Sequence, residues 1–596
     1  MSQIQNIHYE TTRYPAAGQV RMTGRLSVRF QGNIRYLERL YEEKRDWMLE
    51  PIQNRGQAWV VEPLRNQKGE QRWAGEYAGK WLDSASLAVA SNHDEQLSEY
   101  AATFAAAILS AQESDGYLGI DVPAERGGAS EWDLWNIKYA MTGLLTHYEV
   151  SQNKAFLDAA VRSGEWLINQ YGMVTDASNP FFHSPEGGGV SANIVDELVR
   201  LYRFSSEQKF LEFALSVMAH FPPVLRMRET LKVPLVHAYT MLSYLGAIVE
   251  LIAVENSAKK LGWVEKIWED IVDHHLYPTG SLGYNELLQT TAPNDTPVEN
   301  GLPGRHHQET CATVEWILFN SRLYQATGRM RYLQNMEKSI YNALLAAQST
   351  DGMSWMYFTP LRYEKHWFTG PTSCCYWSGP RAIARLPQWV YALDNQGIRV
   401  NLYETSEIRF QHEGRAVTLK QLSLYPEEGR VILHLQPDQP ARFTISMRIP
   451  TGSNQACIKH NGRAIPCGSG ADGYYRIQRT WFADDQIEME FDIPVAVEHF
   501  MGDRYGILVR GVEVFAVDQR DNPGLDIDQL FLLDKMILSR TSTIDGRRRY
   551  TGEVYAGCQY MQVVFTPYAD CGGGDTRFRT AFPIHPEVKS AADHVA

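Results

Sequence analysis

The stretch LYRFSSEQKFLEFA at residues 201–214 carries the pattern on which the fold depends. Its apolar residues recur at helical spacing, stop at a polar break, and then resume at Phe210. Related strings occupy residues 145–160 (LTHYEVSQNKAFLDAA) and 323–336 (LYQATGRMRYLQNM), and a fainter copy occupies residues 251–267. Each copy predicts a helix, a short loop and a second helix.

Recurrence of such hairpins roughly every fifty to sixty residues indicates stacked or ring-closed pairs of helices. Long segments separate the hairpins. We therefore expect a closed toroid of inner and outer helices, an (α/α)6 barrel, and not an open solenoid. In such a barrel the loops at one end build the binding site.

The pattern changes after Trp389. Runs such as 397–403 and 442–449 alternate apolar and polar residues and predict short strands of an antiparallel β-sandwich. The chain is thus expected to be a multidomain α+β protein. The predicted parts are a barrel over residues 1–392, a β-sandwich over 393–505 and a second β-rich region over 506–596.

The N-terminal part mixes two signals. Residues 24–30 alternate as a strand does, whereas residues 33–49 have the spacing of a helix. From about Trp81 onward the pattern is strongly helical. We therefore predict one strand ahead of the helices of the barrel.

Composition excludes several classes of protein. A net charge of −13 over 596 residues argues against a nucleic-acid partner, because phosphate binding needs a basic surface. No uninterrupted apolar run reaches membrane-spanning length, and the N-terminus lacks the features of a secretory signal. Seven cysteines without such a signal suit reduced thiols, so we predict a cytoplasmic protein. The 15 tryptophans and 31 tyrosines suit a carbohydrate site, although aromatic rings serve cores first.

Two short motifs offer metal ligands: Glu309-Thr310-Cys311 and Cys374-Cys375. One carboxylate and three thiols are a suitable donor set for a closed four-coordinate zinc site. Adjacent cysteines can both reach one metal if the backbone turns sharply, and glycines and prolines on both sides suit such a turn. The spacing alone also fits three inert buried thiols, because it is no general zinc pattern.

Further motifs accompany these two in a set order. In chain order they are Thr279-Gly280-Ser281-Leu282-Gly283 leading to Glu286, Pro293-Asn294-Asp295-Thr296, Glu309-Thr310-Cys311-Ala312 and Cys374-Cys375. This order and spacing resemble the β-L-arabinofuranosidase family, glycoside hydrolase family 127, and its close relatives. The similarity is sharp over residues 279–405 and weaker on both sides. The resemblance implies an (α/α)6 barrel followed by β-sandwich domains, in agreement with the periodicity.

The resemblance also implies a retaining glycosidase whose nucleophile is a zinc-bound cysteine. Carried over, Glu309, Cys311, Cys374 and Cys375 hold Zn²⁺, Cys374 attacks the anomeric carbon, and Glu286 is the general acid and base. A free thiol with a pKa of about 8.5 is mostly protonated at neutral pH, whereas a zinc-bound thiol is deprotonated. A retaining mechanism also needs a second group that protonates the leaving oxygen and then deprotonates water.

Other residues are candidates for contact with the sugar. His237 stands at a predicted helix start where the family carries a substrate-binding histidine, although it also fits a core position. His306 and His307 precede Glu309 and fit either sugar contacts or plain loop positions. Trp377 follows the paired cysteines and fits either stacking on a sugar ring or packing in the core.

Some positions depart from the family pattern. Tyr139 and Ser191 stand where the family carries two further sugar-binding histidines, and Tyr376-Trp377 replaces the prolines expected after the paired cysteines. We predict that Tyr139 contacts the sugar. We hypothesise that the enzyme hydrolyses glycosides of a terminal L-arabinofuranose-like sugar, or of a related L-configured, branched or carboxylated one.

Other functions stay open on the sequence alone. A barrel that has lost catalysis would be a carbohydrate-binding protein with structural zinc, but the presence of both Glu286 and Cys374 argues against this. An unsaturated-uronide hydrolase or a sugar epimerase shares the barrel but needs no thiol cluster. The family resemblance further implies a homodimer. The lack of a secretory signal suggests short imported oligosaccharides as substrates.

Overall fold

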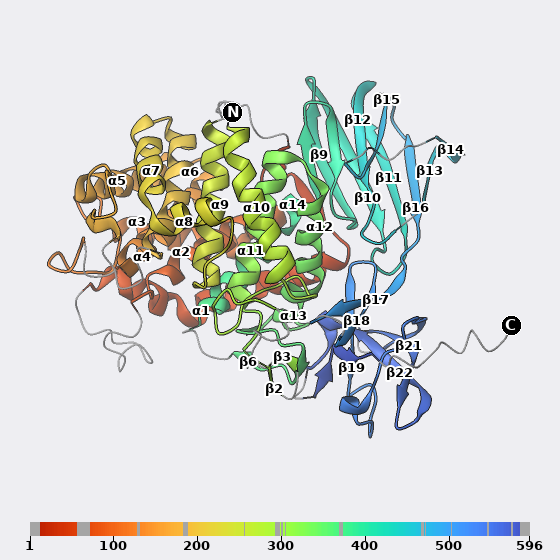
Figure 1. Cartoon of the computed structure of the whole chain (residues 1–596). Helices are drawn as coiled ribbons and strands as arrows, with labels where there is room; N and C mark the ends of the chain where they lie inside the picture. The colour runs from red at the N-terminus through yellow and green to blue at the C-terminus, as the bar shows by residue number, and fades with distance from the viewer. Residues whose placement is uncertain are drawn as a thin grey trace.

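A helical barrel forms the N-terminal part of the chain, and two β-domains pack along one side of it (Figure 1). The structure is a computed structural model. It describes residues 12–55, 72–127, 131–182, 189–255, 257–291, 298–299, 302–303, 306–368, 373–453, 455–466, 470, 472–501, 504–544, 547–573 and 576–584.

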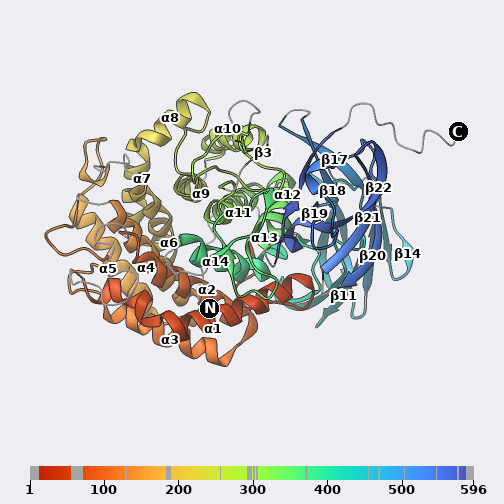
Figure 2. The ribbon, with the colours of Figure 1, turned by 90° about the horizontal axis from the view of Figure 1, so that it is seen from below.

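Six helices of the described chain form a closed inner ring (Figure 2). In order around the ring they are α2 (Glu76–Asn92), α4 (Glu131–Ser151), α6 (Val195–Ser205), α9 (Ala238–Glu255), α11 (Thr310–Thr327) and α14 (Cys374–Trp389). Helix α2 packs against both α4 and α14, so the ring closes. The predicted (α/α)6 barrel is confirmed.

Outer helices cover this ring. They are α1 (Arg25–Gln53), α3 (Glu95–Ser110), α5 (Lys154–Tyr171), α7 (Gln208–His220), α8 (Pro222–Thr230), α10 (Ala258–His274), α12 (Met330–Ser339) and the short α13 (Leu345–Ala347). The repeats seen in the sequence fall on the pairs α4–α5, α6–α7, α9–α10 and α11–α12. The polar breaks end one helix and begin the next: Ser206 ends α6 in the left-handed conformation, and the Asn153 side chain caps α5.

The strand predicted at residues 24–30 is wrong, because this stretch begins helix α1. Seven alternating residues do not exclude a helix, and here Leu26 and Phe30 both face the core, four residues apart. The carboxylate of Glu404, which lies far along the chain, accepts the backbone N–H of Ser27 at 3.2 Å. It thereby satisfies a donor that the first turn of a helix leaves free.

The first β-domain is a sandwich of two sheets. One sheet has the order β1 (Val20–Met22), β9 (Ser406–His412), β10 (Arg415–Ser423), β11 (Arg430–Pro437), β16 (Gln486–Phe491), β13 (Ala456–His460) and β14 (Arg463–Ala464). The other has the order β15 (Tyr474–Trp481), β12 (Ala441–Arg448), β8 (Gly397–Val400) and β7 (Tyr391–Asp394). Among the described strands of the sandwich, only β8 and β12 pair in parallel, and the rest are antiparallel as predicted.

The second β-domain is built on one further sheet. Its main path is β17 (Val495–Phe500), β18 (Tyr505–Arg510), β19 (Glu513–Asp518), β22 (Gln559–Pro567), β21 (Arg547–Ala556) and β20 (Ser539–Ile544), with β23 (Phe578–Arg579), β24 (Ala581–Pro583) and β5 (Arg362–Tyr363) attached. Sheet partners change between Phe491 and Val495. The predicted boundaries differ from this, since residue 505 opens β18 and residue 392 lies inside β7.

Strands from the barrel part of the chain pair with strands of both β-domains, and a buried ion pair also joins the barrel to the sandwich. Strand β1, which precedes the barrel, adds to the sandwich, and β5 from a barrel loop pairs with β23. Small hairpins, β2 (Val298–Glu299) with β3 (Leu302–Pro303) and β4 (Trp355–Met356) with β6 (Trp367–Phe368), extend other loops. Arg448 of β12 pairs with Glu337 of α12, and both side chains are fully buried.

Helix α9 is long and apolar enough to cross a membrane by length and composition, and it is the one such helix in the described residues. Its apolar stretch is 83% buried inside the protein. Within the barrel it packs against α6 and α11, which explains its apolar character.

Two glycines bring helices α2 and α4 into close contact. A Cβ atom on Gly79 would lie 1.8 Å from the carbonyl oxygen of Tyr139. A Cβ on Gly143 would lie 2.9 Å from the carbonyl oxygen of Gly79. This approach also places the ammonium of Lys80 4.6 Å from the centre of the Tyr139 ring.

Gly79→Ala should therefore destabilise the barrel by about 3 kcal/mol, because the added methyl group overlaps rigid backbone of α4. Urea unfolding followed by helical circular dichroism measures this loss. Gly262→Ala, on the exposed face of α10 with open space around it, is the control and should gain about 1 kcal/mol. Equal midpoints for the two variants would contradict the close approach of α2 and α4.

Candidate active site

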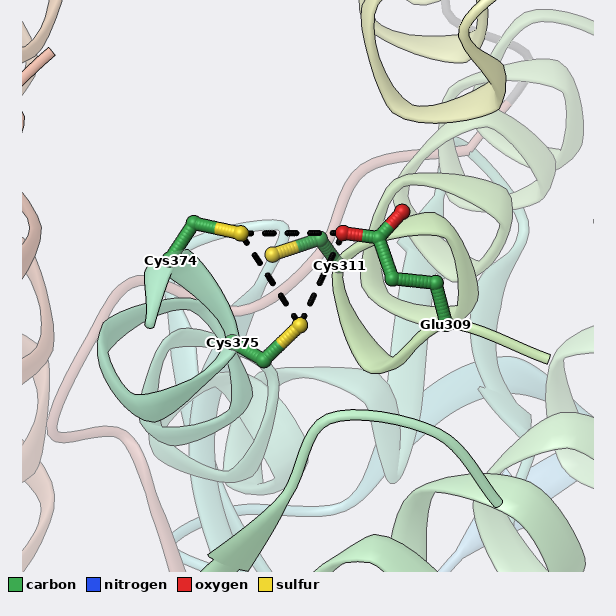
Figure 3. A group of neighbouring side chains, drawn as sticks. All are labelled: Glu309, Cys311, Cys374 and Cys375. Carbon is green, nitrogen blue, oxygen red and sulfur yellow. Dashed lines mark hydrogen bonds between the residues drawn. The ribbon is translucent and has the colours of Figure 1, made fainter. Parts of the chain in front are cut away.

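Glu309, Cys311, Cys374 and Cys375 meet at one end of the barrel (Figure 3). Their ligand atoms all lie within 4.8 Å of one another. Glu309 immediately precedes α11 and Cys311 lies in its first turn, while the paired cysteines are the first two residues of α14. The side chains of Cys374 and Cys375 thus reach the cluster from the first turn of a helix, whereas the sequence predicted a sharp turn of the backbone there.

The distances in this cluster fit a tetrahedral zinc ion. The Sγ atoms of Cys374 and Cys375 each lie 3.6 Å from Oε1 of Glu309, and they lie 3.9 Å from each other. Zinc with bonds of about 2.3 Å to sulfur and 2.0 Å to oxygen holds its ligands about 3.5–3.8 Å apart. Oε1 is the Glu309 oxygen that faces the thiols, and the other carboxylate oxygen points away from them (Figure 3). The residues present therefore fit this metal.

The charges of the cluster also favour a bound cation. Hydrogen bonds from Cys311 and Cys375 hold the pKa of the Cys374 thiol well below its usual value. Burial raises the pKa of Cys311, of Cys375 and of Glu309. The cluster by itself thus favours one thiolate, and ionisation of all four ligands needs a neighbouring positive charge.

The inner helices supply part of that positive potential. Helices α2, α9, α11 and α14 all contribute residues of their first turns to this end of the barrel, and the N-terminus of a helix carries a partial positive charge. Four residues into α2 lies Lys80, whose ammonium pairs with Glu76 at 2.9 Å. Burial opposes the charge on Lys80, but Glu76 together with Tyr139, Cys311 and Cys374 raises its pKa above the ordinary value.

Glu286 lies on the loop between α10 and α11 and faces the cluster through Tyr357. The Tyr357 hydroxyl donates to Oε1 of Glu286 and lies 3.8 Å from Sγ of Cys374. Nε2 of His237 lies 3.4 Å from Oε2 of Glu286. The backbone of Glu286 is in the left-handed region (φ 67°), and its carbonyl accepts the N–H of Ala238 at the start of α9. The loop is thus fixed to the inner ring.

The remaining residues predicted to contact the sugar differ in their exposure. His306 is exposed beside Phe358, and its carbonyl accepts the N–H of Asn285. The imidazole of His307 is buried, with its ring centre 4.6 Å from that of Tyr284.

Trp377 is 1% exposed. Its ring stacks on Trp47, 5.8 Å between ring centres, and lies 5.3 Å from Tyr77. Such burial leaves no free ring face for a sugar, so Trp377 occupies the core position that its sequence also fitted.

An aromatic cluster surrounds the thiols. Its buried members are Trp135, Tyr139, Val190, Tyr239, Cys311 and Cys375, and its partly exposed members are Trp73, Trp132, Tyr357 and Cys374. Tyr139 bonds to Tyr239 through their hydroxyls, and the indole N–H of Trp135 donates to Glu76. The hydroxyl of Ser191, the other departure from the family pattern, donates to the carbonyl of Phe181 at 2.9 Å.

Several residues of this site were not predicted from the sequence. Glu76 and Lys80 stand four apart on a helix, and two charged residues in an otherwise apolar stretch were a signal that could have found them. Tyr357 lies just after a two-residue strand, and nothing in its local sequence sets it apart. Trp132 and Trp135 are visible in the sequence as aromatic residues, but only the ring of helices brings them to the thiols.

Comparison with known proteins gives the same assignment for most of the chain. Residues 23–388 match the family model "Beta-L-arabinofuranosidase, GH127 catalytic domain", and residues 397–493 match the model of the GH127 middle domain. A curated relative, the non-reducing end β-L-arabinofuranosidase of Bifidobacterium longum subsp. longum, is 21% identical over 526 residues, which cover 75% of each chain.

Solved structures share the fold. A GH127 β-arabinofuranosidase superposes with a TM-score of 0.82 at 21% identity, covering 98% of this chain and 99% of its own. A GH127 β-L-arabinofuranosidase from Geobacillus stearothermophilus T6 gives 0.81 at 19% identity, covering 95% and 100%.

These matches define the protein as a glycoside hydrolase. The chain belongs to the β-L-arabinofuranosidase family, glycoside hydrolase family 127, as its motifs had indicated. Its substrate is accordingly a glycoside or an oligosaccharide. The family assignment favours the hydrolase over the binding protein, the uronide hydrolase and the epimerase that the sequence left open.

Lys80→Met should cost about 3–5 kcal/mol of stability, because Glu76 then stays buried without its counter-ion. The double variant Glu76→Gln/Lys80→Met should regain part of that loss, since no unpaired charge remains. Urea midpoints measure both. Lys266→Met, which breaks an exposed pair with Glu269, is the control and should leave the midpoint unchanged. A double variant less stable than Lys80→Met would refute this account.

Proposed function

We propose that the protein is a retaining exo-glycosidase that releases a terminal L-arabinofuranose or a related L-sugar. Cys374 is the nucleophile and Glu286 is the general acid and base. The observation that carries the proposal is the contact of one hydroxyl, that of Tyr357, with both groups. Cys374 and Glu286 therefore lie no farther apart than these two contacts span. Retaining enzymes hold their two catalytic groups at such short separations, about 5–5.5 Å for a carboxylate pair.

Zinc is the cofactor that the donor set favours. Glu309, Cys311, Cys374 and Cys375 would hold it, because the separations of their ligand atoms match tetrahedral zinc. A bound zinc ion keeps the thiols in the thiolate form at neutral pH and fixes their direction.

The reaction then proceeds in two displacements. In the first, Cys374 Sγ forms a bond to the anomeric carbon, the glycosidic C–O bond breaks, and Glu286 gives its proton to the leaving oxygen. In the second, Glu286 takes a proton from water, the water oxygen bonds to the anomeric carbon, and the C–S bond breaks. Two displacements restore the original anomeric configuration. The Tyr357 hydroxyl orients the Glu286 carboxyl group in both steps.

The relatives support the choice of sugar. The Bifidobacterium enzyme is named as acting on β-L-arabinofuranose at the non-reducing end, and this supports exo action on the same or a similar sugar here. Tyr139 and Ser191 replace two family histidines, and Tyr139 lies in the aromatic cluster beside Cys311. Both side chains are fully buried, and their hydroxyls bond to Tyr239 and to the carbonyl of Phe181, which supports a sugar other than plain arabinofuranose.

Zinc content tests the cofactor. Wild type and Glu286→Gln, purified in reductant without chelator, should hold one zinc per chain by plasma mass spectrometry. Cys375→Ser should retain much less, because it loses a thiolate ligand. Cys457→Ser, at an exposed cysteine of the sandwich, is the control and should keep its zinc. Wild-type protein without zinc would rule out the metal-bound nucleophile.

Kinetics test the catalytic roles. Glu286→Gln should lower kcat/KM about 10²- to 10⁴-fold on a methyl β-L-arabinofuranoside. The loss should be smaller on the 4-nitrophenyl glycoside, because that leaving group needs little protonation. Cys374→Ser should abolish turnover of both substrates, whereas Cys457→Ser should match wild type. Equal losses on both leaving groups in Glu286→Gln would argue against a role as the acid.

A further inference from the structure

A tight turn of two residues carries Glu286. Tyr284 and Leu287 exchange two backbone hydrogen bonds, each 2.9 Å long, and Asn285 and Glu286 lie between them. Both of these central residues have positive φ, 44° for Asn285 and 67° for Glu286. Two positive values in a two-residue hairpin loop define a type I′ turn, which favours asparagine first and glycine second. The proposed general acid therefore occupies a backbone position that suits glycine.

Hydrogen bonds on both sides of the turn hold it in this conformation. On one side the N–H of Asn285 donates to the carbonyl of His306 at 3.0 Å. On the other side the carbonyl of Glu286 accepts the N–H of Ala238 at 2.7 Å. The turn is thus attached both to the segment before α11 and to the start of α9. Unfavourable backbone conformations persist where the surrounding structure fixes them in this way, and they cluster at functional sites.

The turn places the Glu286 carboxyl group between two side chains. Its Oε1 accepts from the Tyr357 hydroxyl, which lies 3.8 Å from Sγ of Cys374, and its Oε2 lies 3.4 Å from Nε2 of His237. A retaining reaction uses this carboxyl group twice, first on the leaving oxygen and then on water. Because both steps occur at one anomeric carbon, the carboxyl group has to stay in one place, and a rigid turn meets that need.

We propose that Asn285 is a positioning residue for the general acid. Asparagine adopts the left-handed conformation more readily than most other residues with a side chain. Asn285 therefore permits the turn, and the turn sets the place of the Glu286 carboxyl group. The side chain of Asn285 is exposed, whereas its N–H is bonded within the protein, so we assign its role to the backbone. This inference rests on the proposed function, in which Glu286 is the acid.

Two substitutions separate the backbone of Asn285 from its side chain. Asn285→Gly removes the side chain and keeps positive φ accessible, so kcat/KM should stay within about twofold of wild type. Asn285→Val disfavours positive φ and should displace the carboxyl group. Its kcat/KM on the methyl β-L-arabinofuranoside should fall about tenfold to a hundredfold, mainly through kcat. On the 4-nitrophenyl glycoside the loss should be no more than about threefold, because that leaving group needs little protonation.

A hairpin of the sandwich offers the matched control. Glu413 and Gly414 connect β9 to β10, where His412 pairs with Arg415, and their φ values are 47° and 79°. Glu413 is exposed, as Asn285 is. Glu413→Val therefore places the same residue type in the same kind of turn. It should lower the thermal unfolding midpoint about as much as Asn285→Val does, and it should leave kcat/KM unchanged on both glycosides.

Three results would overturn the positioning role. Equal losses on the two glycosides in Asn285→Val would indicate a general structural role, and unchanged activity would show that the turn tolerates valine. A loss in Asn285→Gly would assign the effect to the side chain. If Asn285→Val does not fold, Asn285→Ala takes its place, since alanine conflicts less with positive φ. Its loss should be smaller but again greater on the methyl glycoside, and equal losses would overturn the inference.

Glu286→Gln, measured beside these variants, distinguishes this inference from the proposed function. A greater loss on the methyl glycoside in Glu286→Gln, without the same pattern in Asn285→Val, would sink the positioning role alone. Equal losses on both glycosides in Glu286→Gln, or wild-type protein inactive on both, would sink the assignment of Glu286 as the acid, and the role of Asn285 would fall with it.

Discussion

The structure depends on the meeting of four ionisable ligands at the buried starts of two helices. Glu309 and Cys311 belong to α11, and Cys374 and Cys375 open α14. Such a concentration of acidic groups is costly in a protein interior unless positive charge balances it. The N-termini of the helices and the ammonium of Lys80 supply positive charge there. The ligand set also fits a zinc ion, which would supply more. The barrel is the scaffold that makes this meeting possible, since only a closed ring brings α11, α14 and α2 to one point.

Close packing of the inner helices turns this scaffold into a specific site. The glycine contact between α2 and α4 lets Lys80 reach the ring of Tyr139, and the Glu76 carboxylate joins Lys80 to Trp135. On the opposite side, the loop of Glu286 is tied to the start of α9. Glu76 and Lys80 therefore contact both each other and the aromatic residues of the site. A substitution of one of those aromatic residues would also change the surroundings of these two charges.

Both β-domains supply side chains that cap or pair with helices of the barrel. Glu404 of the sandwich caps helix α1, and Arg448 neutralises the buried Glu337 of α12. In the C-terminal domain, Asp570 pairs with Arg25 and Arg29 of α1. Each contact pairs a charge or a backbone donor of the barrel, at a face that a β-domain covers, with a group from that β-domain. We infer that the three parts fold as one unit, although their sequences have distinct patterns.

The sequence by itself determined the helical hairpins, the later strands and the metal-competent set, because periodicity and residue type are local properties. The motif around Glu309 and the paired cysteines also identified the family. Tertiary structure decided the rest: that residues 25–30 are helical, that Trp377 is buried, and that Tyr357 links Glu286 to Cys374. These outcomes depend on partners distant in the chain, such as Glu404 for α1 and Trp47 for Trp377. No local pattern encodes such partners, since burial and pairing arise only when the ring closes.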